Sequence, residues 1–346
     1  MRAITLTPGV RNSACLDDVP EPAAADGSLL VRTLALGICG TDREIVAAEY
    51  GEAPPGHERL ILGHESLGVV EQPTDGFAAG DHVVGIVRRP DPVPCPACAV
   101  GEWDMCRNGL YTERGIKARH GFGCERFRIE PEFAVKVDAS LGLLAVLLEP
   151  ASIVAKAWDH TEHVGARARW WRPRSVFITG AGPIGLLAAL MGAQHGLNVH
   201  VFDRHQDGPK PKLIHDLGGI HHDDLAAIDE VKPDIVMECT GAPTVVRDVL
   251  GRTAPGGVLC LLSVTPSRTM EIDIGMFNRH AVLDNDATFG AVNANRHHYE
   301  MAAQALARAD KAWLERLITR RVPLARWSEA LEHRQDDIKV VIDFTL

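Results

Sequence analysis

The sequence predicts a two-domain α/β fold in which a β-rich domain is joined to a doubly wound parallel sheet. Short alternating runs separated by glycine and proline, such as Ser28–Thr33 and Leu67–Val70, indicate a β-rich first domain. From about Ser175, apolar strands alternate with helical stretches, which is typical of a parallel sheet with helices on both faces. The 346 residues are enough for about two such domains.

The doubly wound domain is predicted from its elements in chain order. Strands are expected at Val176–Thr179, Val199–Phe202, Ile235–Glu238 and Val258–Ser263, and a helix at Ile184–Gln194. The tail from about Arg296 indicates a helix, a turn and the strand Lys339–Phe344, whose alternation resembles that of the first domain. We therefore predict a discontinuous first domain, residues 1–155 and 296–346, with a nucleotide-binding domain, residues 156–295, inserted into it.

Composition excludes several classes of partner. The 36 basic and 46 acidic residues give a net charge of −10, which argues against nucleic acid because phosphate binding requires clustered cations. No basic-then-apolar leader opens the sequence, and the most apolar stretch, Leu141–Val154, is interrupted by Glu149 and Pro150 and is too short to span a bilayer. We expect a soluble, cytoplasmic protein that binds neither nucleic acid nor membrane.

A glycine-rich turn between the first strand and the first helix predicts a dinucleotide site of the Rossmann type. Gly180 permits a tight turn, Gly182 lets the backbone approach a pyrophosphate, and Gly185 lets the helix and strand pack closely. The pyrophosphate is expected on the helix N-terminus, where free N–H groups and the dipole favour negative charge. The cofactor-binding residues predicted here are Gly180, Gly182, Pro183, Ile184, Gly185, Thr240 and Asn293.

The acidic residue at the end of the second strand bears on the choice of cofactor. Asp203 lies eighteen positions after Gly185, where a carboxylate accepts hydrogen bonds from ribose hydroxyls and repels a 2′-phosphate. The sequence therefore favours NAD. Arg204 follows directly and could pair with a 2′-phosphate, so NADP remains possible. An alternative reading of Asp203 is a simple turn cap.

Three short segments before the fingerprint carry metal-binding side chains. They are Cys39-Gly40-Thr41-Asp42, Gly63-His64-Glu65 and Glu149-Pro150. A thiolate, an imidazole and a carboxylate are the ligands of a catalytic zinc, which keeps one position open for substrate or water. Taken singly, Cys39 could be a packing residue and Glu65 an ion-pair partner.

Together these segments resemble the medium-chain zinc-dependent alcohol dehydrogenases and reductases over nearly the whole chain. The resemblance rests on 37–42, on Gly63-His64-Glu65 with Gly68, on Gly80-Asp81 and on the fingerprint, in the expected order. Thr74 departs from it, since a small glycine or alanine is usual there. The resemblance implies a GroES-like catalytic domain beside the Rossmann domain. It implies that Cys39 and His64 bind the catalytic zinc, with Glu65, water or Glu149 as the third ligand, and that Thr41 relays the proton.

A second cysteine group resembles the structural zinc lobe of that family. Cys95, Cys98 and Cys106 match the last three of its four cysteines, but Pro92 stands where the first is expected. Three thiolates rarely close a structural zinc site. Asp91 or Asp104 could complete the site, and three reduced cysteines without metal are the alternative. In either case the lobe is expected to stabilise a loop and to carry no chemistry.

Within the family the chain looks most like the glucose (aldose) 1-dehydrogenase branch. The similar segments are 87–90, 113–116, 120–122, 148–150, 292–293 and 298–299. By that resemblance Glu113, Glu149 and Asn293 contact a pyranose, and Arg89 and His298 are weaker candidates. A polyol needs several carboxylate and amide acceptors in one place, whereas a simple alcohol needs an apolar site.

The sequence therefore predicts a zinc-dependent enzyme that transfers a hydride from C1 of an aldose to NAD(P) and yields an aldonolactone. A polyol or secondary-alcohol dehydrogenase, of the sorbitol or threonine type, is the alternative within the family. A non-catalytic nucleotide-binding protein is a third hypothesis, which the presence of Cys39 and His64 disfavours. We expect a homo-oligomer, a dimer or a tetramer, in which a strand such as Val258–Val264 could pair across a two-fold axis.

Overall fold

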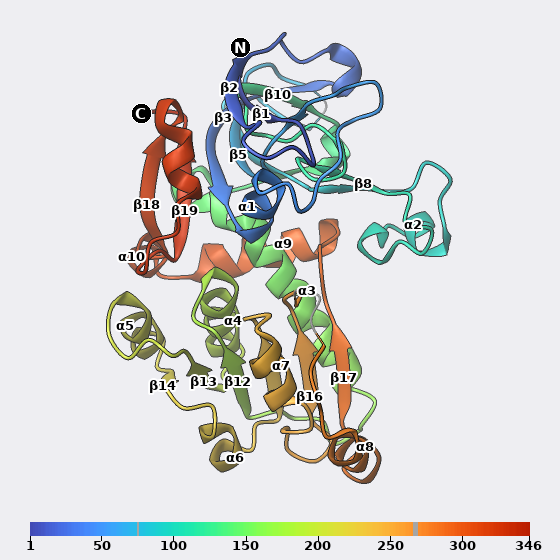
Figure 1. The fold of residues 1–346 in the computed structure, drawn as a ribbon, viewed down its shortest axis with the longest axis vertical. Helices are drawn as coiled ribbons and strands as arrows, with labels where there is room; N and C mark the ends of the chain where they lie inside the picture. The colour runs from blue at the N-terminus through green and yellow to red at the C-terminus, as the bar shows by residue number, and fades with distance from the viewer. Residues whose placement is uncertain (75, 266–268) are drawn as a thin grey trace. The chain divides into compact units, whose positions relative to one another are not determined.

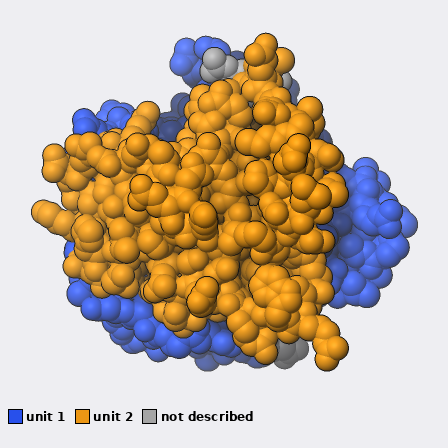
Figure 2. Space-filling view, turned by 90° about the horizontal axis from the view of Figure 1, so that it is seen from below, with its two compact units in different colours: residues 1–150, 293–346 blue, residues 151–292 orange. Residues whose placement is uncertain are grey.

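The computed structural model of the chain describes residues 1–74, 76–265 and 269–346. The described residues form two compact units, one made of Met1–Pro150 and Asn293–Leu346 and the other of Ala151–Val292. The first unit is discontinuous, because the second is inserted between its two segments. Figure 1 labels many of the helices and strands, and Figure 2 colours the two units.

The first unit is built mainly from β-strands. They are β1 (Arg2–Leu6), β2 (Cys15–Asp18), β3 (Leu29–Ile38), β4 (Leu60–Ile61), β5 (Glu65–Val70), β6 (His82–Gly85), β7 (Arg88–Arg89), β8 (Thr112–Arg114), β9 (Ala118–Arg119), β10 (Arg126–Ile129), β11 (Ala134–Lys136), β18 (Ile318–Pro323) and β19 (Lys339–Asp343). The main sheet has the order β11-β6-β5-β3-β19-β18, and β10 also pairs with β3. Two smaller sheets have the orders β2-β1-β4 and β7-β8-β9.

The helices of this unit are short. They are α1 (Gly40–Val46), α2 (Pro96–Ala99), α9 (Arg296–Arg308) and α10 (Lys311–Glu315), with 3₁₀ turns η1 (Ala24–Asp26), η2 (Trp103–Met105), η3 (Pro131–Phe133), η4 (Ala139–Leu147) and η5 (Leu324–Leu331). The tail was expected to be a helix, a turn and a strand. It contains α10 and β18 in addition, and β18 runs parallel to β19. β19 pairs antiparallel with β3, so the last strand of the chain lies beside one of the first.

The second unit has the predicted alternation of strand and helix. Its strands are β12 (Ser175–Thr179), β13 (Asn198–Phe202), β14 (Ile220–His222), β15 (Ile235–Glu238), β16 (Val258–Leu261) and β17 (Ala287–Gly290), and its helices are α4 (Pro183–Gln194), α5 (Pro209–Asp216), α6 (Ala227–Val231), α7 (Pro243–Val249) and α8 (Ile274–Leu283). The strands are parallel in the order β14-β13-β12-β15-β16-β17. The order reverses between β12 and β15, which is where a doubly wound sheet binds its ligand. The predicted fold class is confirmed.

One expectation about the sheet edge is wrong. Residues 258–261 form β16, which pairs with β15 on one side and with β17 on the other. Its backbone N–H and C=O groups are therefore already used and cannot pair across a two-fold axis. Among the described strands the edge on this side is β17.

The two units are connected by α3 (Leu148–Gly165), which begins in the first unit and continues in the second. The stretch Ala139–Gly165 is the one described helical segment with the length and hydropathy of a membrane span, and 72% of its most apolar window is buried inside the protein. Such burial is typical of a core helix, because a membrane-spanning helix turns its apolar side chains outward to lipid.

Candidate active site

The predicted zinc ligands of the first unit come together at the beginnings of two elements, α1 and β5. Cys39 is the N-cap residue of α1, His64 directly precedes β5 and Glu65 begins that strand. One donor atom from each of Cys39, His64 and Glu65 lies within 4.8 Å of the others, and we call these three residues the metal-donor cluster. The Cys39 Sγ and His64 Nε2 atoms are 3.2 Å apart. A thiolate, an imidazole and a carboxylate so close together are a donor set that fits zinc.

Asp42 orients the first two donors. Its Oδ2 atom accepts a hydrogen bond of 2.9 Å from the Cys39 N–H, and its Oδ1 atom lies 3.3 Å from His64 Nδ1. Burial acts to raise the pKa of Asp42, but His64 and the Cys39 N–H outweigh it and the pKa is lowered. Because Nδ1 faces a carboxylate, Nε2 is the nitrogen that faces Cys39 and is available to a metal.

Lys339 of β19 holds the third donor. Its ammonium forms a close ion pair with Glu65 Oε2, and the lysine is only 1% exposed. Burial alone would lower the pKa of Lys339, but Glu65 and Cys39 raise it overall, so the lysine stays charged. Gly37 of β3 is required here, because a Cβ atom at that position would lie 2.0 Å from Glu65 Oε2. Glu65 is therefore shared between the metal-donor cluster and a buried cation.

Glu149 and Thr41 lie around the cluster. Glu149 is the second residue of α3 and is buried. Burial, with Glu65 and Asp42, raises its pKa to about 7, although His64 and Lys339 act in the opposite direction. Thr41 lies in the first turn of α1, and its hydroxyl makes no hydrogen bond with the described residues.

A second group of polar side chains contains two of the predicted sugar-binding residues. Asn293 donates from Nδ2 to Glu113 Oε1 at 2.7 Å, although 180 positions separate them. Arg88 donates to the same oxygen from Nε at 3.1 Å and from Nη2 at 2.9 Å. Arg88 was not predicted as a site residue. Its proximity follows from the register of β7 with β8, which sets Arg88 opposite Glu113.

The two weaker candidates have other partners. Arg89 pairs with Glu130 at 3.0 Å, and its guanidinium lies 3.9 Å from the ring centroid of Phe133. His298 is buried in the first turn of α9, with Nδ1 3.9 Å from Asp104 Oδ2. Neither side chain has a hydrogen bond to Glu113 or Asn293 in the described part of the chain.

The fingerprint loop of the second unit has the geometry that a pyrophosphate requires. Gly180 has a φ of +86°, and a Cβ there would lie 2.8 Å from Thr240 Cγ2, so Thr240 lines the same loop. A Cβ at Gly185 would lie 1.7 Å from Gly180 O, whereas one at Gly182, the N-cap residue of α4, would meet nothing within 4 Å. The space over Gly182 and the free N–H groups of α4 fit an anion.

Two carboxylates organise the loops around this site. Buried Glu238 accepts hydrogen bonds from Thr179 Oγ1 at 3.2 Å and from the Thr240 N–H at 2.8 Å, and so fixes the loop after β15. Asp203 accepts from the Ala181 N–H at 2.8 Å and lies 2.6 Å from His205 Nδ1. Burial tends to raise the pKa of Asp203, but the Ala181 and His205 N–H groups lower it. Asp203 is therefore anionic and joined to the fingerprint loop.

Comparison with known proteins decides the family. Residues 142–344 match the family described as "Glucose dehydrogenase C-terminus", and residues 25–139 match "Alcohol dehydrogenase GroES-like domain". The chain is 41% identical over 350 residues to glucose 1-dehydrogenase 1 of Caldivirga maquilingensis and 40% identical to glucose 1-dehydrogenase of Thermoproteus tenax, with 99% of each chain covered in both cases. The chain belongs to the glucose dehydrogenase family.

A solved structure of this glucose dehydrogenase family has the same fold. The Haloferax mediterranei glucose dehydrogenase, described in complex with NADP, Zn and gluconolactone, superposes with a TM-score of 0.91 at 33% identity, and all of both chains is covered. The predicted resemblance, the dehydrogenase class and the use of zinc and a nicotinamide dinucleotide are thereby confirmed.

The cysteine lobe, which we define as residues 91–106, is the remaining predicted site of this family member. Cys95, Cys98 and Cys106 have their sulfur atoms within 4.8 Å of one another. The Arg107 N–H, 3.3 Å from Cys95 Sγ, is the largest of the influences that lower the pKa of Cys95 to about 6. Asp104 Oδ1 accepts a hydrogen bond of 2.9 Å from Asn295, whereas Asp91 Oδ2 is buried and has no hydrogen-bond partner among the described residues.

Proposed function

We propose that the protein oxidises C1 of a glucose-like pyranose to the aldonolactone and transfers the hydride to NAD(P). The observation that carries this proposal is the coexistence, in one unit, of the metal-donor cluster with the Glu113–Asn293 pair. The first supplies donors for zinc and the second supplies acceptors for sugar hydroxyls. The curated relatives named glucose 1-dehydrogenase support the same substrate class.

Cys39 and His64 would hold the catalytic zinc, with Glu65 or Glu149 as the third ligand. When bound, zinc acts as a Lewis acid that polarises the substrate oxygen and lowers the pKa of the hydroxyl. Asp42 fixes the orientation of His64 through Nδ1. The Thr41 hydroxyl accepts the proton of the C1 hydroxyl and donates its own onward, because a hydroxyl can do both at once.

Glu113 and Asn293 would recognise the sugar. Glu113 Oε1 already receives Arg88 and Asn293, so its second oxygen is the one presented to a hydroxyl. The guanidinium of Arg88 forms an ion pair of 2.9 Å with this buried carboxylate, and a carboxylate acceptor binds a hydroxyl more strongly than a neutral acceptor does. Glu149 is the third proposed contact, and the positions of Arg89 and His298 give them less support.

The second unit would bind the dinucleotide. The adenosine ribose would approach Asp203, whose charge favours the free hydroxyls of NAD over the phosphate of NADP. Lys210 Nζ lies 3.6 Å from Asp203 Oδ2, and Arg204 is exposed beside it. These cations give a 2′-phosphate possible partners, so we propose NAD as the preferred cofactor and NADP as an alternative. In Asp203→Ala the ratio of the NAD to the NADP association constants should fall about tenfold, and in Arg204→Gln it should rise.

A turnover panel separates the aldose proposal from the polyol or secondary-alcohol alternative. Zinc-loaded enzyme is assayed with NAD and with NADP on glucose, galactose, xylose, sorbitol, threonine and propan-2-ol. Turnover of an aldose that is lost in Cys39→Ala supports the proposal. Activity confined to polyols or simple alcohols would be consistent with zinc-dependent hydride transfer but would contradict an aldose as the substrate. Absence of activity on every substrate would favour a non-catalytic nucleotide-binding protein.

The cysteine lobe is proposed to bind a structural zinc through Cys95, Cys98 and Cys106. Asp91 and Asp104 each accept one hydrogen bond through Oδ1, from the Val93 N–H and from Asn295 Nδ2. Asp91 is the better candidate for the fourth ligand, because Asp104 Oδ2 faces His298 Nδ1 at 3.9 Å, whereas Asp91 Oδ2 is buried without a hydrogen-bond partner among the described residues. The backbone N–H of Asp91 also acts to lower the pKa of the Cys98 thiol, which puts Asp91 near this sulfur. Zinc analysis should find two ions per chain in the wild type and one in Cys106→Ala.

We also infer a cytoplasmic homo-oligomer, dimeric or tetrameric, in which copies associate through the β17 edge. Exposed apolar side chains gather in the sequence before this strand, at Val264, Ile274, Val282 and Leu283. Among the described strands β17 is paired on one side only, and such an edge, in the same unit as these exposed apolar residues, fits a second copy of the chain. Light scattering on Leu283→Asp should show smaller particles than the wild type, whereas Val93→Asp, at an exposed lobe position, should not.

A further inference from the structure

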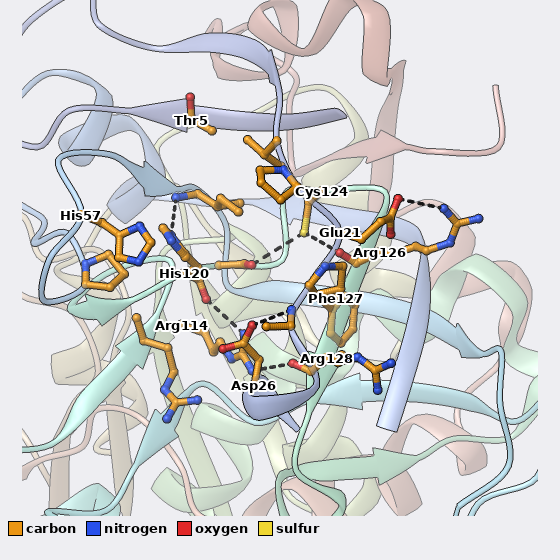
Figure 3. A pocket seen from close by; sticks show the side chains of 18 of the residues that line it. Thr5, Glu21, Asp26, His57, Arg114, His120, Cys124, Arg126, Phe127 and Arg128 are labelled. Atoms are coloured by element: carbon orange, nitrogen blue, oxygen red, sulfur yellow. Dashed lines mark hydrogen bonds and ion pairs between the residues drawn. The ribbon is translucent and has the colours of Figure 1, made fainter. Parts of the chain in front are cut away.

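A cavity with many charged residues in its wall lies in the first unit, apart from the residues of the candidate active site. It has a volume of about 590 Å³ and is lined by parts of β1, β2, β9 and β10 and by the segments 19–26, 54–61 and 119–121. None of Cys39, His64, Glu65, Glu113 and Glu149 lines it. Figure 3 shows the side chains that surround it, among them Arg114, His120 and Arg128.

Most charges that line this cavity are paired. Asp17 pairs with Arg59 at 3.2 Å, and Glu130 pairs with Arg119 at 3.1 Å. Glu21 lies 3.4 Å from Arg126 and 3.9 Å from the N-terminal ammonium, and Arg126 also pairs with Glu71 at 3.0 Å. Asp26 accepts the Ala23 N–H at 3.1 Å.

Two guanidinium groups have no carboxylate partner among the described residues. Arg114 is only 4% exposed and donates to two backbone oxygens, of His120 at 3.3 Å and of Arg128 at 2.7 Å. Arg128 has two long contacts of 3.4 Å, to the backbone oxygens of Gly27 and Ser28. In both residues Nε is buried and without a hydrogen-bond partner among the described residues. A buried guanidinium without a counter-ion is costly, and Arg114 is such a group. Arg114, together with the half-buried Arg128, is therefore suited to an anion.

His120 adds a neutral donor to the same wall. Its Nδ1 atom accepts a hydrogen bond of 3.2 Å from the Ile61 N–H, so in the neutral ring the proton is on Nε2. Burial, with the nearby His57 and Arg114, lowers the pKa of His120 to about 4, although the carboxylate of Asp26 acts in the opposite direction, and the ring is therefore neutral near pH 7. The His57 and His120 rings meet edge to face, with centroids 4.8 Å apart.

We propose that this cavity binds the phosphate group of a small phosphorylated metabolite, held by Arg114 and Arg128 with His120 as a neutral donor. Two guanidiniums without a carboxylate match the charge of nearly −2 of a phosphate monoester at neutral pH. The planar fork of each guanidinium suits phosphate oxygens. The volume exceeds that of a bare phosphate and falls within the range of small-molecule sites.

The cavity is connected to the candidate active site through β8. Arg114 lines the cavity, and its neighbour Glu113 bonds Asn293, as expected for adjacent strand residues that face opposite sides. The loop after β8 also packs on the residue before His64, since a Cβ at Gly115 would lie 2.4 Å from Gly63 O. Binding in the cavity is therefore expected to change the KM for the sugar more than kcat.

Calorimetric titration of the zinc-loaded full chain tests the proposal. The protein is saturated with NAD so that its dinucleotide site is occupied, and inorganic phosphate and glycerol 3-phosphate are the probes. Both should bind with a stoichiometry of one. Arg128→Gln should weaken the association at least about tenfold, as should Arg114→Lys, which keeps the charge and loses the fork. Arg11→Gln, at an exposed arginine of the same unit that does not line the cavity, should leave it unchanged.

Each other result overturns the assignment. If neither inorganic phosphate nor glycerol 3-phosphate binds, the cavity is not a phosphate site. If the wild type and Arg128→Gln bind the probes equally well, the phosphate binds elsewhere on the protein. Acetate or gluconate binding in place of phosphate would identify a carboxylate site. Arg128→Gln keeps the test informative if Arg114→Lys fails to fold, because Arg128 is only half-buried and makes only long contacts. The titration needs no sugar turnover, so its result is independent of the substrate proposal.

Discussion

The metal-donor cluster and the cysteine lobe are two candidate zinc sites in one unit, and they are supported differently. In the cluster two donors have a buried partner from another element: His64 faces Asp42 of α1, and Glu65 pairs with Lys339 of β19. In the lobe the sulfur atoms lie in a segment of twelve residues and depend on local backbone N–H groups such as that of Arg107. The metal-donor cluster is therefore built into the main sheet of the unit, whereas the cysteine lobe organises only its own loop.

Removal of one cysteine sulfur from each site should give the largest difference in activity between the metal-donor cluster and the cysteine lobe. Cys39→Ala should lower kcat/KM for glucose about 10³-fold or more, because a zinc ligand supplies several kcal/mol of transition-state stabilisation. Cys106→Ala should leave kcat/KM within about twofold and lower the melting temperature. Steady-state kinetics and thermal melts of both variants provide the measurement. Equal losses of activity would show that the lobe takes part in catalysis.

Loss of the buried cation beside Glu65 should have the next largest effect. In Lys339→Met the carboxylate stays buried without its partner, so the free energy of unfolding should fall by about 3 kcal/mol. Lys136→Met, which removes a solvent-exposed partner of Asp81, should change it little. Denaturant unfolding of the two variants gives both values. A stable Lys339→Met protein would mean that Glu65 does not need the ammonium.

Asp42→Asn should weaken zinc binding at the metal-donor cluster, although it replaces none of the zinc ligands. The neutral amide orients His64 less well, and the expected loss in zinc affinity is 10–100-fold. Competition with a chelator, read out as zinc release, measures it. Release from the cysteine lobe should be unaffected, and parallel weakening of both ions would contradict the separation of the two sites.

Asp91→Asn should have the smallest effect and should affect only the lobe. An amide oxygen is a poorer zinc ligand than a carboxylate, so the lobe ion should be lost first during dialysis. The zinc content of the wild type and of Asp91→Asn after graded dialysis tests whether Asp91 is the fourth ligand. Unchanged retention would exclude Asp91 as the fourth ligand and would favour another donor or three reduced cysteines.

Elements with regular apolar patterns could be predicted from the sequence, and elements that depend on distant pairing could not. The fingerprint loop was predictable because Gly180, Gly182 and Gly185 lie between an apolar strand and an apolar helix. β18 was missed because Arg320 and Arg321 interrupt its pattern, and these arginines pair with Asp337 and Asp343.

Prediction of the candidate active site from the sequence has similar limits. Cys39 and His64 carry motif neighbours that point to metal, whereas Lys339 is a lone lysine in an apolar strand whose partner is 274 positions away. The adjacent arginines of β7 show a second limit. Adjacent strand residues face opposite sides, so only register distinguishes Arg88, beside Glu113, from Arg89, beside Glu130.

Transfer of isotope from the substrate tests the proposed reaction most directly. The zinc-loaded enzyme is supplied with NAD and glucose deuterated at C1, and the reduced cofactor is analysed by NMR and mass spectrometry. We expect one deuterium on C4 of the nicotinamide and an aldonolactone that lacks deuterium. Reduced cofactor without deuterium would contradict the account, because the hydride would then come from another carbon.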